Sequence, residues 1–414
     1  MLRMNIIDFK LYTNTTFVSL KYPNYRLWFI GQIISLVGTW VQITAQGYLM
    51  YELTHSMAYL GYMSLASGLP TILLMLYGGV FADRFSRRYL LIITQSVMMI
   101  LAFILFFLVY FQVVLPWHIL MLSVLFGITN SFDVPARQAF VFELVQKKDL
   151  SNAIALNSMM FNLGAIIGPA IAGIMYASMG ASWCFLVNGL SFLAIILVLF
   201  GLKMDSLSKT KDKKPLKGQL AEGMQYCFKN ETIRLFILLT LCTGSIGMSF
   251  TTLLPAWATD ILKGNAVTYG YLNSARGLGS LMGALIVASI GSVTKRYGVL
   301  QTATFLFPIF LLLFALHDNL KMALIFMIGM GVGLIIIFNT LNSLIQSLVS
   351  DQLRGRVMSV YSVAFFGGMP LGSFLAGIIA EFIGARTTII ISSVICFMVA
   401  IAFYVKSKKP FALS

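Results

Sequence analysis

Two stretches of this chain decide its fold: residues 164–173 read GAIIGPAIAG, and residues 368–377 read GMPLGSFLAG. They lie 204 positions apart, and at that spacing residues 144–181 match residues 348–385 without gaps at eleven of 38 positions. The aligned glycines are Gly164 with Gly368, Gly168 with Gly372 and Gly173 with Gly377. Because Gly in a membrane helix usually marks close packing, the repeat predicts two halves of equal topology, related by an axis along the membrane normal.

The composition indicates a membrane protein rather than a soluble one. Of the 414 residues, 59% are hydrophobic and 10% are charged, whereas soluble domains are about half apolar and about a quarter charged. A water-soluble fold cannot bury so much apolar surface, which excludes a soluble enzyme, a disordered protein and a secreted disulfide scaffold. The net charge of +15 does not indicate a nucleic-acid partner, because the basic residues cluster at the ends of apolar runs.

Twelve apolar runs are long enough to cross a bilayer, which takes about 20 helical residues. The first six cover residues 27–51, 59–81, 89–111, 117–141, 153–177 and 182–202, and the second six cover residues 233–258, 267–293, 299–316, 320–347, 357–380 and 387–405. The sequence therefore predicts an all-α membrane protein, with twelve transmembrane helices in two pseudo-symmetric six-helix bundles.

The basic residues predict the orientation. Of the 29 Lys and Arg residues, 24 fall on one side of the predicted membrane, three fall on the other side and two lie within spans. The positive-inside rule then places both termini and the long central loop in the cytoplasm. The expected segments are a cytoplasmic N-terminal segment 1–26, a first bundle 27–202, a linker 203–232, a second bundle 233–405 and a cytoplasmic tail 406–414. Within the linker, a helix is expected at residues 216–228.

The loop after the second span, residues 79–88, reads GVFADRFSRR. A carboxylate at Asp83 can cap a nearby helix N-terminus and pair with Arg84 or Arg88. Such a cluster can hold one side of a two-bundle protein closed. The alternative is that Arg84, Arg87 and Arg88 only set the membrane orientation.

Charges within spans are rare and usually functional. Asp133 and Arg137 lie one turn apart on the fourth span, where they can form a pair, and Glu143 lies near the end of that span. These three residues are candidates for a gate or for proton coupling. Arg276 lies about 15 Å into the eighth span, with no acidic residue in that span. It can bind an anionic substrate, pair with another helix, or be a structural cation held by backbone carbonyls.

Polar residues form stripes along the first and tenth spans. Because such stripes are costly when they face lipid, they must face protein or water, and the alternative to a substrate cavity is hydrogen bonding between helices. The residues of these stripes are Gln32, Ser35, Thr39, Gln42 and Gln46 in the first span, and Asn339, Asn342 and Gln346 in the tenth.

The span count and both motifs resemble the major facilitator superfamily. Residues 79–88 match its signature loop, G-x-x-x-D-R/K-x-G-R/K-R/K, except at Ser86, and residues 164–173 match its antiporter motif, G-x-x-x-G-P-x-x-G-G, except at Ala172. The stretch DVPAR at residues 133–137, followed by Asn152-Ala153 and Asn157, is most similar to the branch that contains bacterial enterobactin-type siderophore and macrolide exporters.

The resemblance implies alternating access of the two bundles in a bacterial cytoplasmic membrane, with a substrate cavity lined by spans one, four, seven and ten. Its gating motif corresponds to Gly79, Asp83, Arg84, Arg87 and Arg88, and its antiporter motif to Gly164, Gly168, Pro169 and Gly173. The cavity candidates are the two stripes above together with Asn130 and Arg276.

We therefore expect a proton-coupled secondary exporter of small or mid-sized organic compounds, such as a siderophore, a macrolide or another drug. It would act as a monomer among membrane lipids, without cofactor, metal or nucleic acid. The alternatives are a lipid or lysolipid translocator, and a receptor of the same fold that transports nothing. Enzyme chemistry is poorly supported, because His55, His118 and His317 all fall at predicted external ends and the sequence has no nucleotide-binding motif.

The orientation is tested by cysteines introduced at Lys213 and at Ser56 in a chain without its four native cysteines. We expect a membrane-impermeant maleimide added to intact cells to label position 56 and to leave position 213 unlabelled. Labelling of both positions from outside would contradict the topology.

Overall fold

In the computed structural model, the described residues are 17–202, 217–290 and 293–407, and they form helices and short connections without a strand. Most of the predicted N-terminal segment, the first part of the linker and most of the tail lie outside the described residues. Eleven of the helical segments are long and apolar enough to cross a membrane. The twelfth, α11, is 24 residues long but contains Asn273 and Arg276, which lower its hydropathy.

The first half contains a short 3₁₀ helix η1 (Val18–Lys21) and six long helices. These are α2 (Pro23–Thr54), α3 (Met57–Arg84), α4 (Arg87–Tyr110), α5 (Pro116–Leu144), α6 (Leu150–Met179) and α7 (Ala181–Gly201), with a 3₁₀ turn η2 (Lys147–Asp149) before α6. Their apolar side chains enclose cores of their own.

The second half follows α8 (Lys217–Lys229), the helix expected within the linker. Its helices are α9 (Glu231–Cys242), α10 (Phe250–Ala256), α11 (Ala266–Ser289), α12 (Val293–Leu316), α13 (Leu320–Leu348), α14 (Asp351–Ile383) and α15 (Ala385–Ser407). Two π-helical turns, η3 (Thr243–Gly247) and η4 (Trp257–Ile261), join α9 and α10 into one rod from Glu231 to Ile261. The predicted seventh span is therefore longer than expected and contains two π turns, which are frequent at functional sites.

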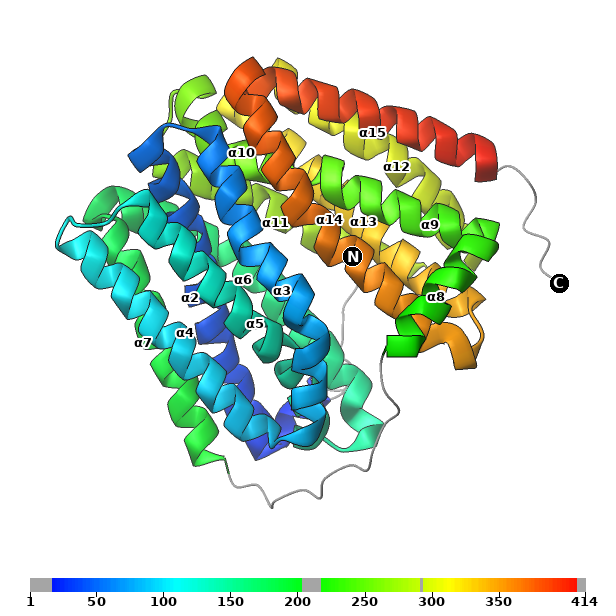
Figure 1. Ribbon diagram of the computed structural model, residues 1–414, viewed down its shortest axis with the longest axis horizontal. Coiled ribbons are helices and arrows are strands. Elements are labelled where there is room, and N and C mark those ends of the chain that lie inside the picture. Colours follow the sequence, from blue (N-terminus) through cyan, green and yellow to red (C-terminus); the bar gives the residue numbers. More distant parts are fainter. Residues whose placement is uncertain (1–16, 203–216, 291–292, 408–414) are drawn as a thin grey trace, which may run out of the picture.

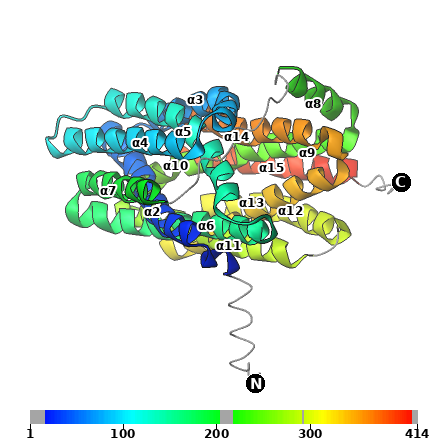
Figure 2. The ribbon, with the colours of Figure 1, turned by 90° about the horizontal axis from the view of Figure 1, so that it is seen from below.

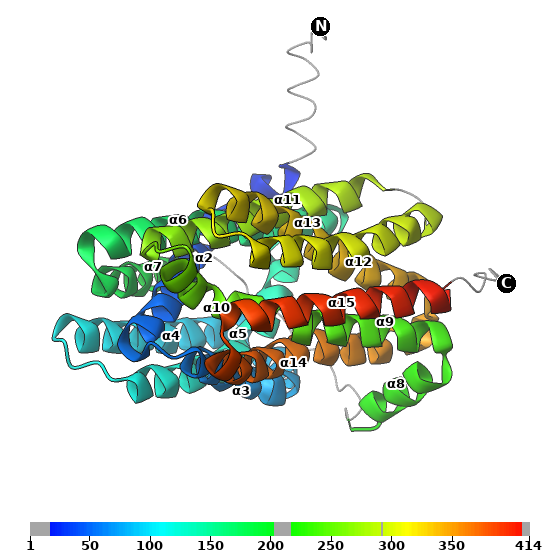
Figure 3. The same ribbon diagram turned by 90° about the horizontal axis from the view of Figure 1, so that it is seen from above.

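Equivalent helices pack in the same way in both halves. In the first, α3 packs on α5, and α4 packs on α5 and α7; in the second, α11 packs on α13, and α12 packs on α13 and α15. Two helix pairs join the halves, α3 with α14 on one side and α6 with α11 on the other (Figures 1, 2 and 3). This arrangement confirms the predicted fold of two pseudo-symmetric bundles.

The repeated glycines of the sequence make equivalent contacts in the two halves. A Cβ added at Gly168 would lie 2.4 Å from Trp40 Cβ on α2, and one added at Gly372 would lie 1.8 Å from Ser245 O on η3. Gly173 instead faces the other half, where a Cβ would lie 2.6 Å from Ala266 O on α11. Its repeat partner Gly377 faces Met57 and Gly61 on α3, also across the boundary.

We call the end of the molecule that carries α8 and the turn between α3 and α4 the linker end, and the opposite end the distal end. Contacts between α3 and α14 run from the distal end to the middle of both helices, where a Cβ at Gly367 would lie 3.9 Å from Ile72 Cδ1. Gly61, Gly68 and Gly79 share one face of α3, because they are separated by two and by three turns. A Cβ at Gly68 would lie 2.1 Å from Pro370 Cγ, whereas a Cβ at Gly79 would meet no atom within 4 Å. The two halves therefore diverge toward the linker end.

The boundary contact at Gly173 can be tested with Gly173→Val. Because the new side chain meets backbone atoms of α11, which cannot move aside, we expect it to disfavour the closed distal end by about 1–3 kcal/mol. A cysteine at Ala256, which is 1% exposed and packs among residues of the first half, should then react faster with a maleimide. Gly201→Val is the control, because open space surrounds Gly201. An unchanged rate in Gly173→Val would contradict the contact.

Candidate functional site

A carboxylate of α14 holds the distal end of α3. Glu381 Oε2 accepts hydrogen bonds from the backbone N–H groups of Met57 (2.7 Å) and Ala58 (3.1 Å) and from Ser56 Oγ (3.0 Å). The first N–H groups of a helix have no partner within the helix and carry partial positive charge, so an anion is stabilised there. We call this contact the distal clamp. It links the two halves, so it must break if they separate at this end.

Aromatic side chains continue the closure beside the distal clamp. Tyr51 on α2 donates a hydrogen bond to Asp260 on η4, and Tyr48 stacks on Tyr269 of α11 with ring centroids 6.2 Å apart. Both contacts cross the boundary between the halves. The π turn η4 is the element that presents Asp260 to Tyr51.

At the linker end, the residues of the signature loop form a cluster within the first half. Arg87 Nη1 lies 2.7 Å from Glu143 Oε1, and Arg87 Nη2 lies 3.8 Å from Asp83 Oδ1. The side chain of Asp83 is 54% exposed. Within the described part of the chain, these charged side chains make no hydrogen bond or ion pair with α14, in keeping with the open space at Gly79.

The expected partner of Asp83 was wrong. Arg87 pairs with Asp83 rather than Arg84 or Arg88, because Arg87 begins α4 directly after the turn and faces both acids. Arg88 donates to the carbonyls of Leu199 and Phe200, each at 2.7 Å. These carbonyls lie in the last turn of α7, where they lack partners within the helix. Arg84 ends α3 and is exposed.

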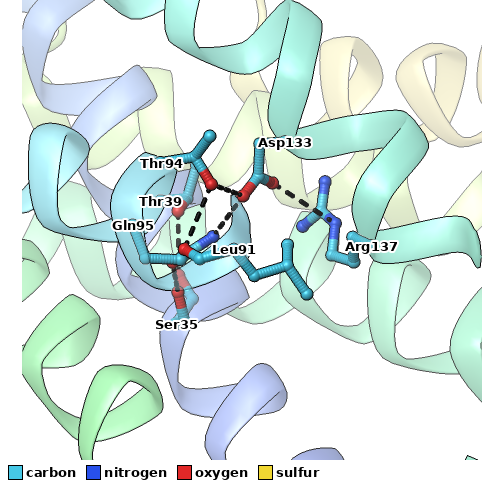
Figure 4. A network of polar contacts seen from close by, with 7 residues as sticks. All are labelled: Ser35, Thr39, Leu91, Thr94, Gln95, Asp133 and Arg137. Carbon is cyan, nitrogen blue, oxygen red and sulfur yellow. Dashed lines mark hydrogen bonds and ion pairs between the residues drawn. The ribbon is translucent and has the colours of Figure 1, made fainter. Parts of the chain in front are cut away.

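The predicted pair of Asp133 and Arg137 forms, at 3.6 Å between Oδ2 and Nε. Figure 4 shows that Asp133 is also held from α4, where Thr94 Oγ1 and Gln95 Nε2 each donate at 2.8 Å. Asp133 is 1% exposed. Three side chains therefore hold this buried carboxyl group, and its network lies wholly within the first half.

The polar stripe of α2 faces the interior of the first half, so the structure supports hydrogen bonding between helices for most of it. Gln42 Oε1 accepts from Asn188 Nδ2 of α7 (2.7 Å), and Gln46 Nε2 donates to Ser123 Oγ of α5 (2.9 Å). Ser35 Oγ is 3.5 Å from Gln95 Oε1, and Gln32 is 2% exposed. Ser35 and Gln42 therefore fit the alternative, hydrogen bonding between helices, whereas Gln32 Nε2 is buried without a hydrogen-bond partner among the described residues. The helical period predicted that these residues share a face, but not which helices that face meets.

A cavity of about 160 Å³ lies beside that stripe, within the first half. Thr39, Gln42 and Gln46 contribute its polar wall, and Met63 and Phe126 contribute apolar wall. Such a cavity has room for several water molecules.

The polar residues of α13 are more open. Asn339 is exposed although it lies well within an apolar helix of 29 residues. Asn342 is half-buried and accepts a hydrogen bond from Gln346, which is exposed in the last turn. Polar groups facing lipid at this depth would be costly, so this face borders the space between the halves. Asn130 on α5 is half-buried.

Arg276 lies on α11 at a position without a partner. No hydrogen bond or ion pair joins its side chain to the described residues, and its Nε is buried. The face of α11 toward α6 carries Gly270 and Gly277, and the face toward α13 carries Gly279 and Gly283. Tyr269 lies two turns before Arg276 and Gly283 lies two turns after it, so all three share one side of α11, at the edge of the face toward α13.

Twelve helical rods in two like halves, closed by glycine contacts at one end, define a membrane transporter of the major facilitator type. Residues 14–412 match the model of the transmembrane secretion effector family, and the chain belongs to that family of the major facilitator superfamily. Its helices superpose on those of the nucleoside transporter NupG with a TM-score of 0.78 at 14% identity, over 94% of this chain and 100% of that one. A bacterial homologue of the lysosomal transporter Spinster, in an inward-facing and unoccupied conformation, gives a TM-score of 0.71 at 15% identity, over 92% and 95%.

Three relatives match along most of their length. The staphyloferrin A transporter of Staphylococcus aureus is 26% identical over 93% of this chain and 96% of its own. The multidrug efflux pump Tap of Mycolicibacterium fortuitum is 25% identical over 85% and 88%. Macrolide efflux protein A of Streptococcus pyogenes is 22% identical over 92% and 96%. The family and these relatives are transporters, which supports a role other than that of an enzyme.

Sequence reasoning missed Glu381 and Asp260, the acids that join the halves at the distal end. Both lie just beyond predicted spans, Asp260 after residues 233–258 and Glu381 after residues 357–380. Counting carboxylates at span ends, as was done for Lys and Arg, would have singled them out. Glu381 binds the N-terminus of α3 and Asp260 binds Tyr51. Neither partner carries a formal charge, so the sequence does not pair these acids with a basic residue.

The distal clamp predicts that Glu381→Gln, but not Asp83→Asn, opens the distal end. Glu381→Gln removes the anion at the N-terminus of α3, and we expect the labelling rate of a cysteine at Ala256 to rise about two- to fivefold. Asp83→Asn should leave this rate unchanged or lower it, because Asp83 makes no contact across the boundary in this state. A fall in the rate for Glu381→Gln would contradict the clamp.

Proposed function

We propose that this protein is a proton-coupled secondary exporter of a small or mid-sized organic compound, a siderophore or a drug, which works by alternating access. The observation that carries the proposal is the geometry of α3 and α14. One face of α3 is packed against α14 at Gly61 and Gly68 and is open at Gly79. A small rotation of the halves can exchange which end is closed.

The two ends of this helix pair carry equivalent devices. At the distal end, Glu381 near the C-terminus of α14 caps the N-terminus of α3. The helices α3 and α14 are antiparallel, so at the linker end the C-terminus of α3 lies on the same side as the N-terminus of α14. Asp83, near the C-terminus of α3, is therefore the carboxylate able to approach the N-terminus of α14. Asp351 and Arg354 form an ion pair in that first turn (2.6 Å). In the proposed cycle, one carboxylate is engaged when the other is free.

The proposed direction is outward. With 24 of the 29 basic residues at the linker end or in the segments attached to it, that end lies in the cytoplasm by the positive-inside rule. The conformation described here would then accept cargo from the cytoplasm. Efflux in the names of two relatives, the pump Tap and macrolide efflux protein A, supports the same direction.

Asp133 is the proposed proton carrier. It is the one buried acid among the described residues. Thr94 and Gln95 of α4 donate hydrogen bonds to it, and Arg137 of its own helix forms an ion pair with it. Protonation would weaken the attraction to Arg137 and change the bonds to Thr94 and Gln95. A change of proton affinity between the two states is the minimum that coupling requires.

The test is flux in proteoliposomes that contain the full chain, driven by a pH gradient, for a fluorescent drug. We expect Asp133→Asn to abolish uphill transport and to retain exchange without a gradient. The Asn side chain keeps an acceptor oxygen for Thr94 and Gln95, but it cannot take up or release a proton.

The control is the double variant Asp133→Asn/Arg137→Gln, which leaves no uncompensated cation if the single variant folds poorly. Persistent gradient-driven uptake in Asp133→Asn would show that another residue, such as Glu143 or Asp83, or another ion carries the coupling. Absence of any flux in the wild-type chain with a panel of drugs and siderophores would contradict the proposed export function.

A further inference from the structure

We propose that Arg276 is an anion-binding subsite that takes a carboxylate group of the transported compound, an inference that rests on the proposed export function for its physiological role. The guanidinium of Arg276 identifies the subsite. It has no counter-ion in the described part of the chain, and it lies directly below the closed distal end.

The position of Arg276 follows from the helix faces of α11. Tyr269 lies seven residues earlier on the same side of the helix, and it contacts Tyr48 of the other half. Arg276 is therefore about 10 Å from that closure along the helix axis, toward the linker end. Its backbone carbonyl lies against Gly331 of α13, where an added Cβ would be 2.2 Å away. The packed backbone fixes this part of α11, so the side chain has a defined origin.

No acid of the described chain is available to Arg276. Asp133 is the buried acid of the described residues, and it is held by Thr94, Gln95 and Arg137 within the first half. The remaining described acids lie near the helix ends, and α6, α11 and α13 contain none. The nearest polar groups on α11 are also in use, since Asn273 donates to Tyr269 O and Ser280 donates to Arg276 O.

An unpaired guanidinium at this depth is unfavourable unless a ligand or water meets it. A neutral residue would pack here at lower cost, which makes a ligand the simplest reason for the charge. The planar fork of Arg suits bidentate binding of a carboxylate or a phosphate. The charge decides between them: apart from Arg276, the helices α6, α11 and α13 carry one basic residue, Lys321 in the first turn at the distal end. One positive charge balances a carboxylate and leaves a phosphate dianion half-neutralised.

The polar face of α13 supplies a route from the linker end to this subsite. Asn339 is exposed, and it lies eight residues beyond Gly331, about 12 Å along the helix. Asn342 and Gln346 continue the same polar region toward the linker end. A charged solute would therefore pass Arg354, which donates to Gln346 O, and Arg296, which donates to Ser343 Oγ, at the linker end. Beyond them it would meet the uncharged groups of Asn342 and Asn339 before it reaches Arg276.

The experiment compares two probes that differ by one group, rhodamine B, which has a free carboxylate, and its ethyl ester, which has none. Fluorescence anisotropy measures the binding of each to the purified full chain in a neutral detergent. We expect Arg276→Gln to raise the dissociation constant for rhodamine B about ten- to hundredfold, the range for a hydrogen bond to a charged group. Binding of the ester should stay within twofold. Arg276→Lys should fall between the two, because Lys keeps the charge and loses the fork.

Arg386→Gln is the matched control. It removes one positive charge from the same half, but Arg386 pairs with Asp318 at the distal surface and its side chain is 42% exposed. We expect this variant to bind both probes as the wild type does. Thermal unfolding should show Arg276→Gln to be as stable as the wild type or more so, because the substitution removes a partly buried cation without an ion-pair partner among the described residues.

Competitors distinguish the sources of the anion. Displacement of rhodamine B by acetate at concentrations at which inorganic phosphate and phosphatidylglycerol have no effect would support a carboxylate subsite. Stronger displacement by phosphate or by phosphatidylglycerol would overturn it in favour of a free phosphate or a lipid headgroup. Equal loss of both probes in Arg276→Gln, or loss of neither, would also overturn it.

The failure of this inference is distinct from the failure of the proposed function. Gradient-driven flux of the ester and of rhodamine B, equal in the wild type and in Arg276→Gln, would contradict the subsite and leave the exporter in place. Binding of rhodamine B that depends on Arg276, in a chain that moves neither probe across a membrane, would contradict the exporter and leave the subsite in place.

Discussion

The close approach of backbones across the boundary between the two halves is the contact on which the remaining structure depends. Gly61 and Gly377 bring α3 and α14 together, and Gly173 and Gly270 do the same for α6 and α11. Within a bilayer the hydrophobic effect gives little drive for helices to associate, so small residues and packing decide which helices meet. Since these glycines lie in the distal halves of their helices, the contact closes one end and leaves the other apart. The clamp by Glu381 and the stacking of Tyr48 on Tyr269 are possible because the glycines bring the ends together.

Of the charged groups deep within the described spans, Asp133 and Arg137 form a pair, whereas Arg276 has no ion-pair partner. The network around Asp133 joins α2, α4 and α5 of the first half and leaves its carboxylate with three partners. Arg276 has no partner among the described residues, although it lies at a comparable depth. A membrane fold tolerates a satisfied network as part of its core, whereas an unsatisfied cation needs a ligand. This difference is the physical basis for assigning Asp133 to proton exchange and Arg276 to the cargo.

The sequence predicted the parts of this structure that depend on spacing along one helix. The glycine repeat predicted equal packing in both halves, and Asp133 and Arg137, four residues apart, were expected to pair and do. The sequence did not predict which neighbouring helix a given face would contact. The stripe from Gln32 to Gln46 shares a face of α2, but hydrogen bonds to Gln95, Ser123 and Asn188 show that this face points into the first half. Likewise Arg84, Arg87 and Arg88 are alike in sequence, and only the turn before α4 decides that Arg87 meets Asp83.

The most direct test of the account is a pair of distances measured in the same preparation, one at each end of the molecule. Double electron–electron resonance in lipid nanodiscs can use spin labels at the exposed distal positions Val113 and Leu316, and at the exposed linker-end positions Lys148 and Ser350. If the halves rock about the glycine contacts, lowering the pH or adding cargo will lengthen one distance as it shortens the other. Distances that lengthen together, or that keep one value under all conditions, would contradict alternating access about this boundary.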